Sequence, residues 1–271
     1  MLGFMVLAGR KNEGILRQVS DAGWEAFIPF LGRPMVWYVL NAISEVQGES
    51  PLVVVGPSFA LFGKPPCQRC TFLEPKESLL ENLEAGLQAL PGVDEVVVAT
   101  ADIPLIQGDD IADFIRRCRE LEVDVGYPIV KREDCEALLP THRTYVRLRE
   151  GHFSGGNLFY FRREALRRVW PFLAHVYRLR KKPLKLAPLF GWSLIVKALL
   201  GTLRIQDVER KAYRLTGLKA RAIPTARAAI AVDVDKPEDY YAAERWLSQS
   251  GRFDFTYEAL RQYHLRRSEK P

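Results

Sequence analysis

The stretch EVVVATADIP, residues 95–104, decides which fold this sequence predicts. Residues 96–100 are β-branched or small, which is typical of a strand that is buried on both faces of a parallel sheet. Asp102 follows this strand, and Pro104 prevents the strand from continuing. Ligands of open α/β sheets bind beyond the carboxyl ends of such strands, so Asp102 is a candidate functional acid. The alternative is an aspartate that belongs to the cap of the following helix.

Apolar runs and helical patterns alternate on both sides of this stretch. Ser78 and Glu81 have the spacing of a capping box, which predicts that a helix begins at residue 79. Further strands are predicted at 2–7, 52–55, 71–73 and 123–130, and helices at 35–45, 79–90 and 110–120. Strands that alternate with helices form mostly parallel sheets. We therefore predict an α/β fold with three layers, α/β/α, around a mostly parallel, doubly wound sheet.

The pattern changes after Thr144. Residues 145–149 alternate between polar and apolar, which predicts a strand with one solvent-facing side, and an aromatic strand is predicted at 158–161. Between them, Gly155 and Gly156 leave space for a ligand to approach the backbone, and the Asn157 amide can both donate and accept hydrogen bonds. We interpret these three residues as a binding loop; the alternative is a plain turn.

Residues 163–216 are interpreted as helices with a basic face. Within them, 186–203 is apolar but is interrupted by Pro188, Gly191 and Lys197, so it is a poor transmembrane span. An interfacial membrane element, a lid over an acceptor site and ordinary core are all left open for this segment. We predict a single domain over residues 1–271 with a helical insertion at 165–225.

Composition and charge limit the class of protein. The chain has 271 residues and a net charge of +6, which suits a ligand that carries phosphate but is too small to indicate nucleic acid. Residues 2–8 are interpreted as a first strand rather than a signal peptide. Cys67 and Cys70 lack the second pair or nearby histidines of a zinc site, so we expect free thiols in a cytoplasmic protein.

A second acid follows a second predicted strand near the C-terminus. Residues 228–234 predict a final buried strand, and Pro237 suits the start of a last helix at 238–247. Alternation places Asp233 and Asp235 on the same side of the chain, although Asp235 also has the position of a helix N-cap. Mg²⁺ is held by few carboxylates together with phosphate oxygens and water. Asp102 and Asp235 together therefore predict a Mg²⁺ site beside the phosphates of a nucleotide.

The loop after the first predicted strand carries positive charge. Gly9 ends that strand, and Arg10, Lys11 and Arg17 follow it. Backbone N–H groups and cations at such a place are suited to bind phosphate, as is Arg33 at the start of the next helix. A mobile surface loop is the alternative.

Taken in chain order, five motifs resemble those of the MobA-like nucleotidyltransferases, relatives of molybdopterin guanylyltransferase and of the cytidylyltransferases. The motifs are residues 6–9, 28–29 with 32–35, 100–104, 155–157 and 233–239. The resemblance implies a glycosyltransferase-A-like fold of the nucleotide-diphospho-sugar transferase kind. It also implies transfer of a nucleoside monophosphate from an NTP to a phosphorylated acceptor, with Mg²⁺ as cofactor and release of pyrophosphate.

The resemblance assigns roles to particular residues. Asp102 and Asp235 become the Mg²⁺ ligands, and Arg17 and Arg33 join them as candidate catalytic residues. The acceptor is assigned to Gly155, Gly156 and Asn157. The residues assigned to the nucleotide are Leu7, Ala8, Gly9, Arg10, Lys11, Thr100 and Ala101.

Two positions depart from the family pattern. Arg10 replaces the second glycine after Ala-Gly, and Glu25 replaces a lysine that would steady the triphosphate. An uncompensated glutamate there repels a triphosphate, so a protein that binds a nucleotide or nucleotide-sugar without turnover is the alternative. The expected partners are an NTP and a phosphorylated small-molecule or lipid-like acceptor, without nucleic acid. Residues 178–203 are a candidate membrane-surface segment, and the oligomeric state is left open.

Overall fold

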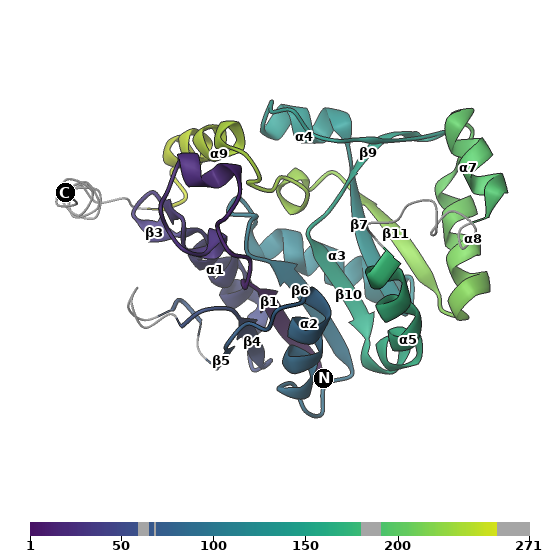
Figure 1. Cartoon of the computed structure of the whole chain (residues 1–271), viewed down its shortest axis with the longest axis horizontal. Coiled ribbons are helices and arrows are strands. Elements are labelled where there is room, and N and C mark those ends of the chain that lie inside the picture. Colours follow the sequence, from purple (N-terminus) through teal and green to yellow (C-terminus); the bar gives the residue numbers. More distant parts are fainter. Residues whose placement is uncertain (59–64, 68, 180–190, 254–271) are drawn as a thin grey trace.

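The computed structural model describes residues 1–58, 65–67, 69–179 and 191–253. Its centre is one large sheet with helices on both faces (Figure 1). The strand order is β5-β4-β1-β6-β10-β7-β9-β8, with β11 paired to β7. The strands are β1 (Leu2–Leu7), β4 (Leu52–Val55), β5 (Cys70–Leu73), β6 (Glu95–Thr100), β7 (Val125–Lys131), β8 (Val146–Leu148), β9 (Gly151–Gly155), β10 (Leu158–Arg162) and β11 (Ala220–Thr225). A separate hairpin joins β2 (Pro29–Phe30) to β3 (Arg33–Pro34).

The helices form the two outer layers. One apolar cluster joins α1 (Met35–Gln47) and α3 (Gly108–Glu120) to one face of β1 and β6. The clusters on the opposite face contain side chains of α2 (Leu79–Gln88) and α5 (Arg163–Leu179). The remaining helices are α4 (Arg132–Leu138), α7 (Trp192–Leu199), α8 (Ile205–Thr216) and α9 (Pro237–Gln249), with short 3-10 turns η1 (Ile15–Gln18), η2 (Glu25–Phe27) and η4 (Ala228–Ile230). The predicted three-layer α/β/α fold is confirmed.

The parallel half of the sheet aligns the carboxyl ends of β1 and β6. Leu7 lies opposite Thr100 in the parallel pairing of these two strands, and Val55 of β4 lies opposite Leu7 on the other side. Because the three strands end together, the loops that follow β1 and β6 emerge at one edge of the sheet. The chain that follows Leu7 and the chain that follows Thr100 therefore leave the sheet side by side, although the two residues are 93 positions apart in sequence.

A two-residue bulge joins β9 to β10. Gly155 pairs with Ile129 of β7, whereas Tyr160 pairs with Gly126, so two residues of the β9–β10 segment have no counterpart on β7. The segment between the two pairings contains Gly156, whose N–H donates to the Pro128 carbonyl of β7, and Asn157; we call these two residues the bulge. A Cβ on Gly156 would come within 2.6 Å of Ile230, so glycine is required for this close packing.

The last strand of the sheet differs from the prediction. Residues 228–234 do not form a strand: they begin with η4 and continue as irregular chain, although Ile230, Val232 and Val234 are buried. Residues 228–234 are mostly apolar because they are buried between the end of β6 and α9, not because they form a strand. The sheet instead ends with β11, which lies inside the segment 165–225 that we expected to be helical and pairs in parallel with β7.

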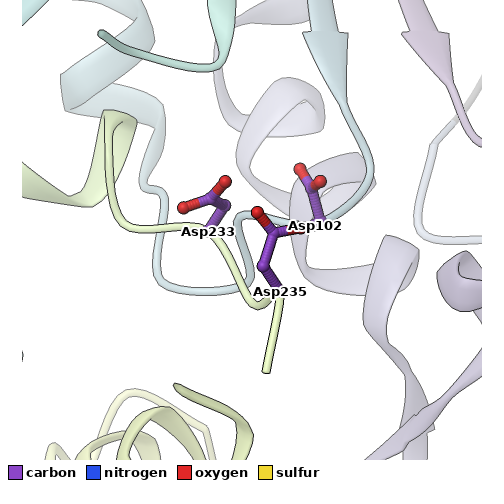
Figure 2. A group of neighbouring side chains, drawn as sticks. All are labelled: Asp102, Asp233 and Asp235. Atoms are coloured by element: carbon purple, nitrogen blue, oxygen red, sulfur yellow. The ribbon is translucent and has the colours of Figure 1, made fainter. Parts of the chain in front are cut away.

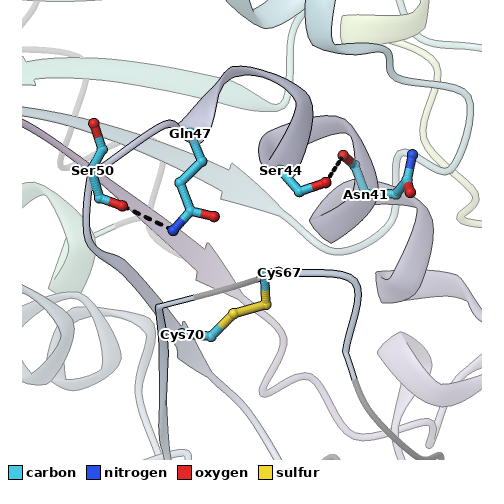
Figure 3. The surroundings of a disulfide bond; sticks show 6 residues. All are labelled: Asn41, Ser44, Gln47, Ser50, Cys67 and Cys70. Carbon is cyan, nitrogen blue, oxygen red and sulfur yellow. Dashed lines mark hydrogen bonds between the residues drawn. A yellow bond between two sulfur atoms is a disulfide. The ribbon is translucent and has the colours of Figure 1, made fainter.

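The prediction of two free thiols at Cys67 and Cys70 is also wrong. A disulfide bond joins them just before β5 (Figure 3). Their spacing is compatible with thiols, a metal site or a disulfide, and only the three-dimensional approach of the two sulfur atoms distinguishes these. Cys118 and Cys135 are free and buried.

The apolar segment 186–203 is predicted to be a poor transmembrane span. In the described part of the chain, no helix has the length and apolar character needed to cross a bilayer. The expected membrane-surface segment 178–203 lies partly outside the described residues, which end at 179 and resume at 191.

The predicted capping box at Ser78 is confirmed and supports the loop beside β1. The Ser78 hydroxyl accepts from the N–H of Glu81, and Asn82 one residue later accepts from the N–H of Lys76. Pro75, which precedes Lys76, in turn packs against Gly9: a Cβ on Gly9 would come within 2.6 Å of Pro75. The start of α2 therefore helps to hold the loop that contacts Gly9.

Replacing Ser78 by alanine should lower the free energy of unfolding by about 1 kcal/mol, because an N–H at the start of α2 loses its acceptor. Ser78→Gly is the matched comparison and should cost only about 0.3 kcal/mol, since glycine leaves the N–H open to water. Urea unfolding followed by circular dichroism measures both. Equal stability of Ser78→Ala and the parent protein would contradict the role of this cap.

Candidate metal and nucleotide site

Three carboxylates gather beyond the carboxyl end of β6. Asp102, Asp233 and Asp235 each offer an oxygen, and these oxygens lie within 4.8 Å of one another (Figure 2). A backbone hydrogen bond of 2.8 Å from the N–H of Val234 to the carbonyl of Asp102 fixes the two segments together. Asp233 and Asp235 flank Val234 in an irregular segment, and Figure 2 shows both beside Asp102. We call these three residues the aspartate cluster.

Burial and repulsion raise the pKa of Asp102 to about 6. Loss of water around the carboxylate is the largest cause, and the nearby charges of Asp233 and Asp235 add to it. The hydroxyl of Thr100, which donates to Asp102, lowers the pKa in part. Asp102 is therefore a carboxylate whose charge is poorly compensated by the protein itself.

Asp233 is held by a buried arginine. The Arg143 side chain is only 6% exposed, and it donates to the carboxylate of Asp233 at 2.5 Å and to its backbone carbonyl at 2.7 Å. Burial and Asp235 raise the pKa of Asp233, while Arg143 opposes them. The sequence analysis placed Asp233 beside Asp235 but did not assign it a role, and nothing in the sequence indicated Arg143.

Arg10 connects the cluster to a fourth carboxylate. Its Nε lies 3.1 Å from Glu25 and its Nη1 lies 3.2 Å from Asp235. Glu25 is almost fully buried, and its pKa is raised to about 7, chiefly by burial; Arg10 lowers it, and Asp102 and Asp235 raise it. The residue that departs from the family pattern thus lies beside the aspartate cluster, and a cation pairs with it.

Asp235 does not cap the last helix. The N-cap of α9 is Lys236, whose N–H donates to the Asp239 carboxylate at 3.1 Å. The alternative interpretation of Asp235 as a capping residue is therefore wrong. Its carboxylate is about half exposed, pairs with Arg10 and faces the other two acids.

The residues predicted to bind a nucleotide lie along the same sheet edge. Leu7, Ala8 and Gly9 continue β1, while Thr100 and Ala101 continue β6 toward Asp102. The loop that follows is closed by two hydrogen bonds, from Glu25 N–H to the Arg10 carbonyl and from Asn12 N–H to the Gly23 carbonyl, both at 3.0 Å.

Lys11, Arg17 and Arg33 are exposed. Arg17 donates to the Asn12 carbonyl at 3.3 Å, and the guanidinium of Arg33 lies 4.0 Å from the centre of the Trp37 ring. Neither arginine forms an ion pair with the aspartate cluster within the described residues, so their assigned roles stay predictions.

The predicted acceptor loop reaches this edge through backbone contacts. Asn157 accepts from the N–H of Thr100 at 3.1 Å and donates its own N–H to Ile230 at 2.8 Å. The bulge therefore lies between the end of β6 and the segment that carries Asp233. The structure brings Gly156 and Asn157 close to Asp102, and binding of an acceptor there stays a prediction.

An α/β sheet with acids and a glycine-containing loop at the carboxyl ends of its parallel strands defines a class of proteins that bind ligands at that edge. The family model of the MobA-like NTP transferase domain matches residues 19–181, more than half of the chain. The protein therefore belongs to the MobA-like NTP transferase family, and the resemblance seen in its motifs is confirmed.

Similar proteins support the same fold. A hypothetical transferase from Thermus thermophilus is 38% identical with a TM-score of 0.78, and the match covers 89% of this chain and 100% of that one. A CMP:2-keto-3-deoxy-manno-octonic acid synthetase complexed with CTP is 16% identical with a TM-score of 0.56, over 92% and 99% of the two chains; this likeness concerns the fold alone. The bifunctional protein GlmU of Parvibaculum lavamentivorans is 33% identical over 99 residues, which span 34% of this chain and 22% of GlmU.

The crowded carboxylates predict an unusual pH dependence of stability without metal. The pKa of Asp102 is about 6 in the folded protein against an ordinary 3.8, and that of Glu25 about 7 against 4.5. The folded state then binds more protons than the unfolded state, so the free energy of unfolding should fall as pH rises from about 4 to about 7. Asp102 alone contributes about 3 kcal/mol to this fall.

Urea unfolding of the metal-free protein at several pH values measures this effect. Asp102→Asn should remove the part due to Asp102 and be more stable than the parent protein at neutral pH. Identical pH profiles for Asp102→Asn and the parent protein would contradict the proposed repulsion.

Proposed function

We propose that this protein is a Mg²⁺-dependent nucleotidyltransferase that moves a nucleoside monophosphate from an NTP to a phosphorylated acceptor and releases pyrophosphate. The single observation that carries the proposal is the aspartate cluster at the carboxyl end of β6. Membership in the MobA-like NTP transferase family supports the reaction class. The aspartate cluster offers carboxylate ligands for a cation, and such a reaction needs the positive charge of a cation beside a triphosphate.

The residues of the cluster fit a hard divalent cation. Their ligand atoms are carboxylate oxygens within 4.8 Å of one another, and burial, with mutual repulsion added to it, raises the pKa of Asp102 and Asp233. A bound cation relieves that repulsion. Asp102 and Asp235 would hold Mg²⁺, because the buried Arg143 holds Asp233, whereas the arginine that pairs with Asp235 is the exposed Arg10. When bound, Mg²⁺ supplies charge neutralisation at phosphate oxygens.

The protein's own groups position the reactants. The turn that follows β1 at Gly9 and the Arg10 guanidinium contact the triphosphate, and the Gly156–Asn157 bulge orients the acceptor. An oxygen of the acceptor phosphate forms a bond to the α-phosphorus, and the bond from that phosphorus to the β-phosphate oxygen breaks, so pyrophosphate leaves. Phosphoryl-type transfer depends on positioning and charge, so the proposed reaction needs no side-chain nucleophile.

Arg10 compensates for the glutamate that replaces the family's lysine. It contacts both Glu25 and Asp235, and its side chain is two-thirds exposed. An arginine at this place can turn to a phosphate once Asp235 has a metal partner. Arg10 then supplies the positive charge that the lysine of the family pattern carries at position 25.

A second candidate function follows from the same glutamate. Glu25 is buried beside Asp102 and Asp235, and its negative charge disfavours a bound triphosphate. A protein of this kind would bind a nucleotide or nucleotide-sugar without turnover. Calorimetry with a nucleotide-sugar, next to a pyrophosphate assay with each NTP, distinguishes the two functions: tight binding with no pyrophosphate from any pair of substrates favours the second.

Asp102→Asn should lower kcat/KM for pyrophosphate release by at least about 100-fold, because charge neutralisation at the phosphates is worth several kcal/mol. Asp109→Asn is the matched control: it removes an exposed acid seven residues away in the first turn of α3. The control should stay within about twofold of the parent protein. Undiminished activity of Asp102→Asn would refute the metal-ligand role.

Glu25→Gln should lower KM for the NTP at pH 8 by at least about threefold, since it removes a negative charge and frees Arg10. Because the pKa of Glu25 is about 7, the difference from the parent protein should shrink as pH falls below that value. Glu13→Gln, which removes an exposed acid of the same loop, is the control. A higher KM for Glu25→Gln would show that Glu25 assists binding.

A further inference from the structure

An apolar cavity of about 370 Å³ lies between α8 and the face of the sheet formed by β7, β9 and β11. Its walls include Val125 and Ile129 of β7, Phe153 of β9, and Ile205 and Val208 of α8. Ligand pockets begin near this volume. The cavity is therefore large enough for a ligand.

The charged residues at this cavity neutralise each other. Arg221 pairs with Glu209 at 2.7 Å, and Glu209 also accepts from the N–H of Ala222 at 3.0 Å. A phosphate placed in the cavity would meet a guanidinium that already has a carboxylate partner and would lose its water. The chemistry of the walls therefore selects an apolar group.

The cavity adjoins the acceptor bulge. Tyr127 and Gly155 both line it, and a Cβ on Gly155 would overlap the Tyr127 hydroxyl. The Tyr127 ring is stacked on Phe159 with ring centres 5.2 Å apart, and the charge of Asp233 contributes to its raised pKa. Asn157, which contacts Thr100, is two residues from Gly155, a span of at most about 7 Å.

Exposed apolar side chains lie on the helix next to α8. Helix α7 buries none of its residues and exposes Trp192, Val196 and Leu199, at 67%, 49% and 83%. Figure 1 shows α7 beside α8, and an ion pair of 2.9 Å from Lys197 to Asp207 joins the two helices. The chain then passes from α7 to Leu203, which lines the cavity.

We propose that this cavity holds the apolar chain of an amphiphilic phosphate, such as a single-chain lipid phosphate, that serves as the acceptor. The inference rests on the proposed function and adds the substrate class. The phosphate lies at the bulge beside the aspartate cluster, where its oxygen attacks the α-phosphorus of the NTP and pyrophosphate leaves. The apolar chain takes no part in the bond changes; it supplies binding energy and selects the acceptor.

A series of methyl, butyl, hexyl and octyl phosphate tests the selection. With NTP and Mg²⁺, KM for the acceptor should fall about threefold to fourfold for each added methylene until the cavity is filled. Ala212→Phe and Ala222→Leu, which fill the cavity from the helix side and from the sheet side, should abolish this dependence. Arg214→Phe adds the same aromatic ring to the exposed side of α8 and should preserve it.

Calorimetry without NTP separates this inference from the proposed function. Octyl phosphate, below its micelle-forming concentration, should bind the full chain at least about tenfold more tightly than methyl phosphate. Ala212→Phe, with its folding checked by circular dichroism, should remove that preference. Chain-length-dependent binding without any pyrophosphate would refute transfer and keep the cavity assignment. Equal binding of the two phosphates, or an unchanged preference in both filled variants, would overturn the cavity assignment even if transfer occurs.

Discussion

Repulsion among carboxylates at the end of β6 is the constraint on which this site depends. Asp102, Asp233 and Asp235 converge there, and Glu25 lies next to them. The fold brings them together through backbone hydrogen bonds and buried apolar packing, which do not depend on the charges. Arg143 and Arg10 offset part of the negative charge from opposite sides. The remaining charge, together with the burial that raises the pKa of Asp102, is the reason for which we propose that the cluster binds a cation.

The two arginines differ in what they are suited to do. Arg143 is buried and holds Asp233 by its carboxylate and its backbone carbonyl, so it fixes the segment before α9. Arg10 is exposed and shares its charge between Glu25 and Asp235, so it is the cation that a phosphate can recruit. Glu25, where the family pattern has a lysine, thus lies in contact with Arg10, where that pattern has a glycine. Both departures from the family pattern form one contact pair.

The opposite halves of the sheet serve different parts of the proposed reaction. The parallel strands β1 and β6 present the turn and the acids that suit a nucleotide and a metal. The antiparallel strands β9 and β10 place a bulge beside them, and the face of β7 and β11 forms the floor of an apolar cavity. The bulge at Gly156 and Asn157 lies between the two regions. Its contacts with Thr100 and Ile230 join the sites that we propose for the two substrates.

The sequence by itself determined the parallel strands, the cap of α2 and the position of Asp102 just beyond β6, because these depend on local patterns of burial and hydrogen bonding. It also placed Asp233 and Asp235 on one side of the chain. Only the tertiary structure decided that residues 228–234 form no strand, that β11 completes the sheet and that Cys67 bonds to Cys70. The strand prediction failed because buried apolar residues form the same pattern in a strand and in an irregular segment. The partners of Glu25 were also decided only by the tertiary structure. Pairings between distant residues depend on how the whole chain packs.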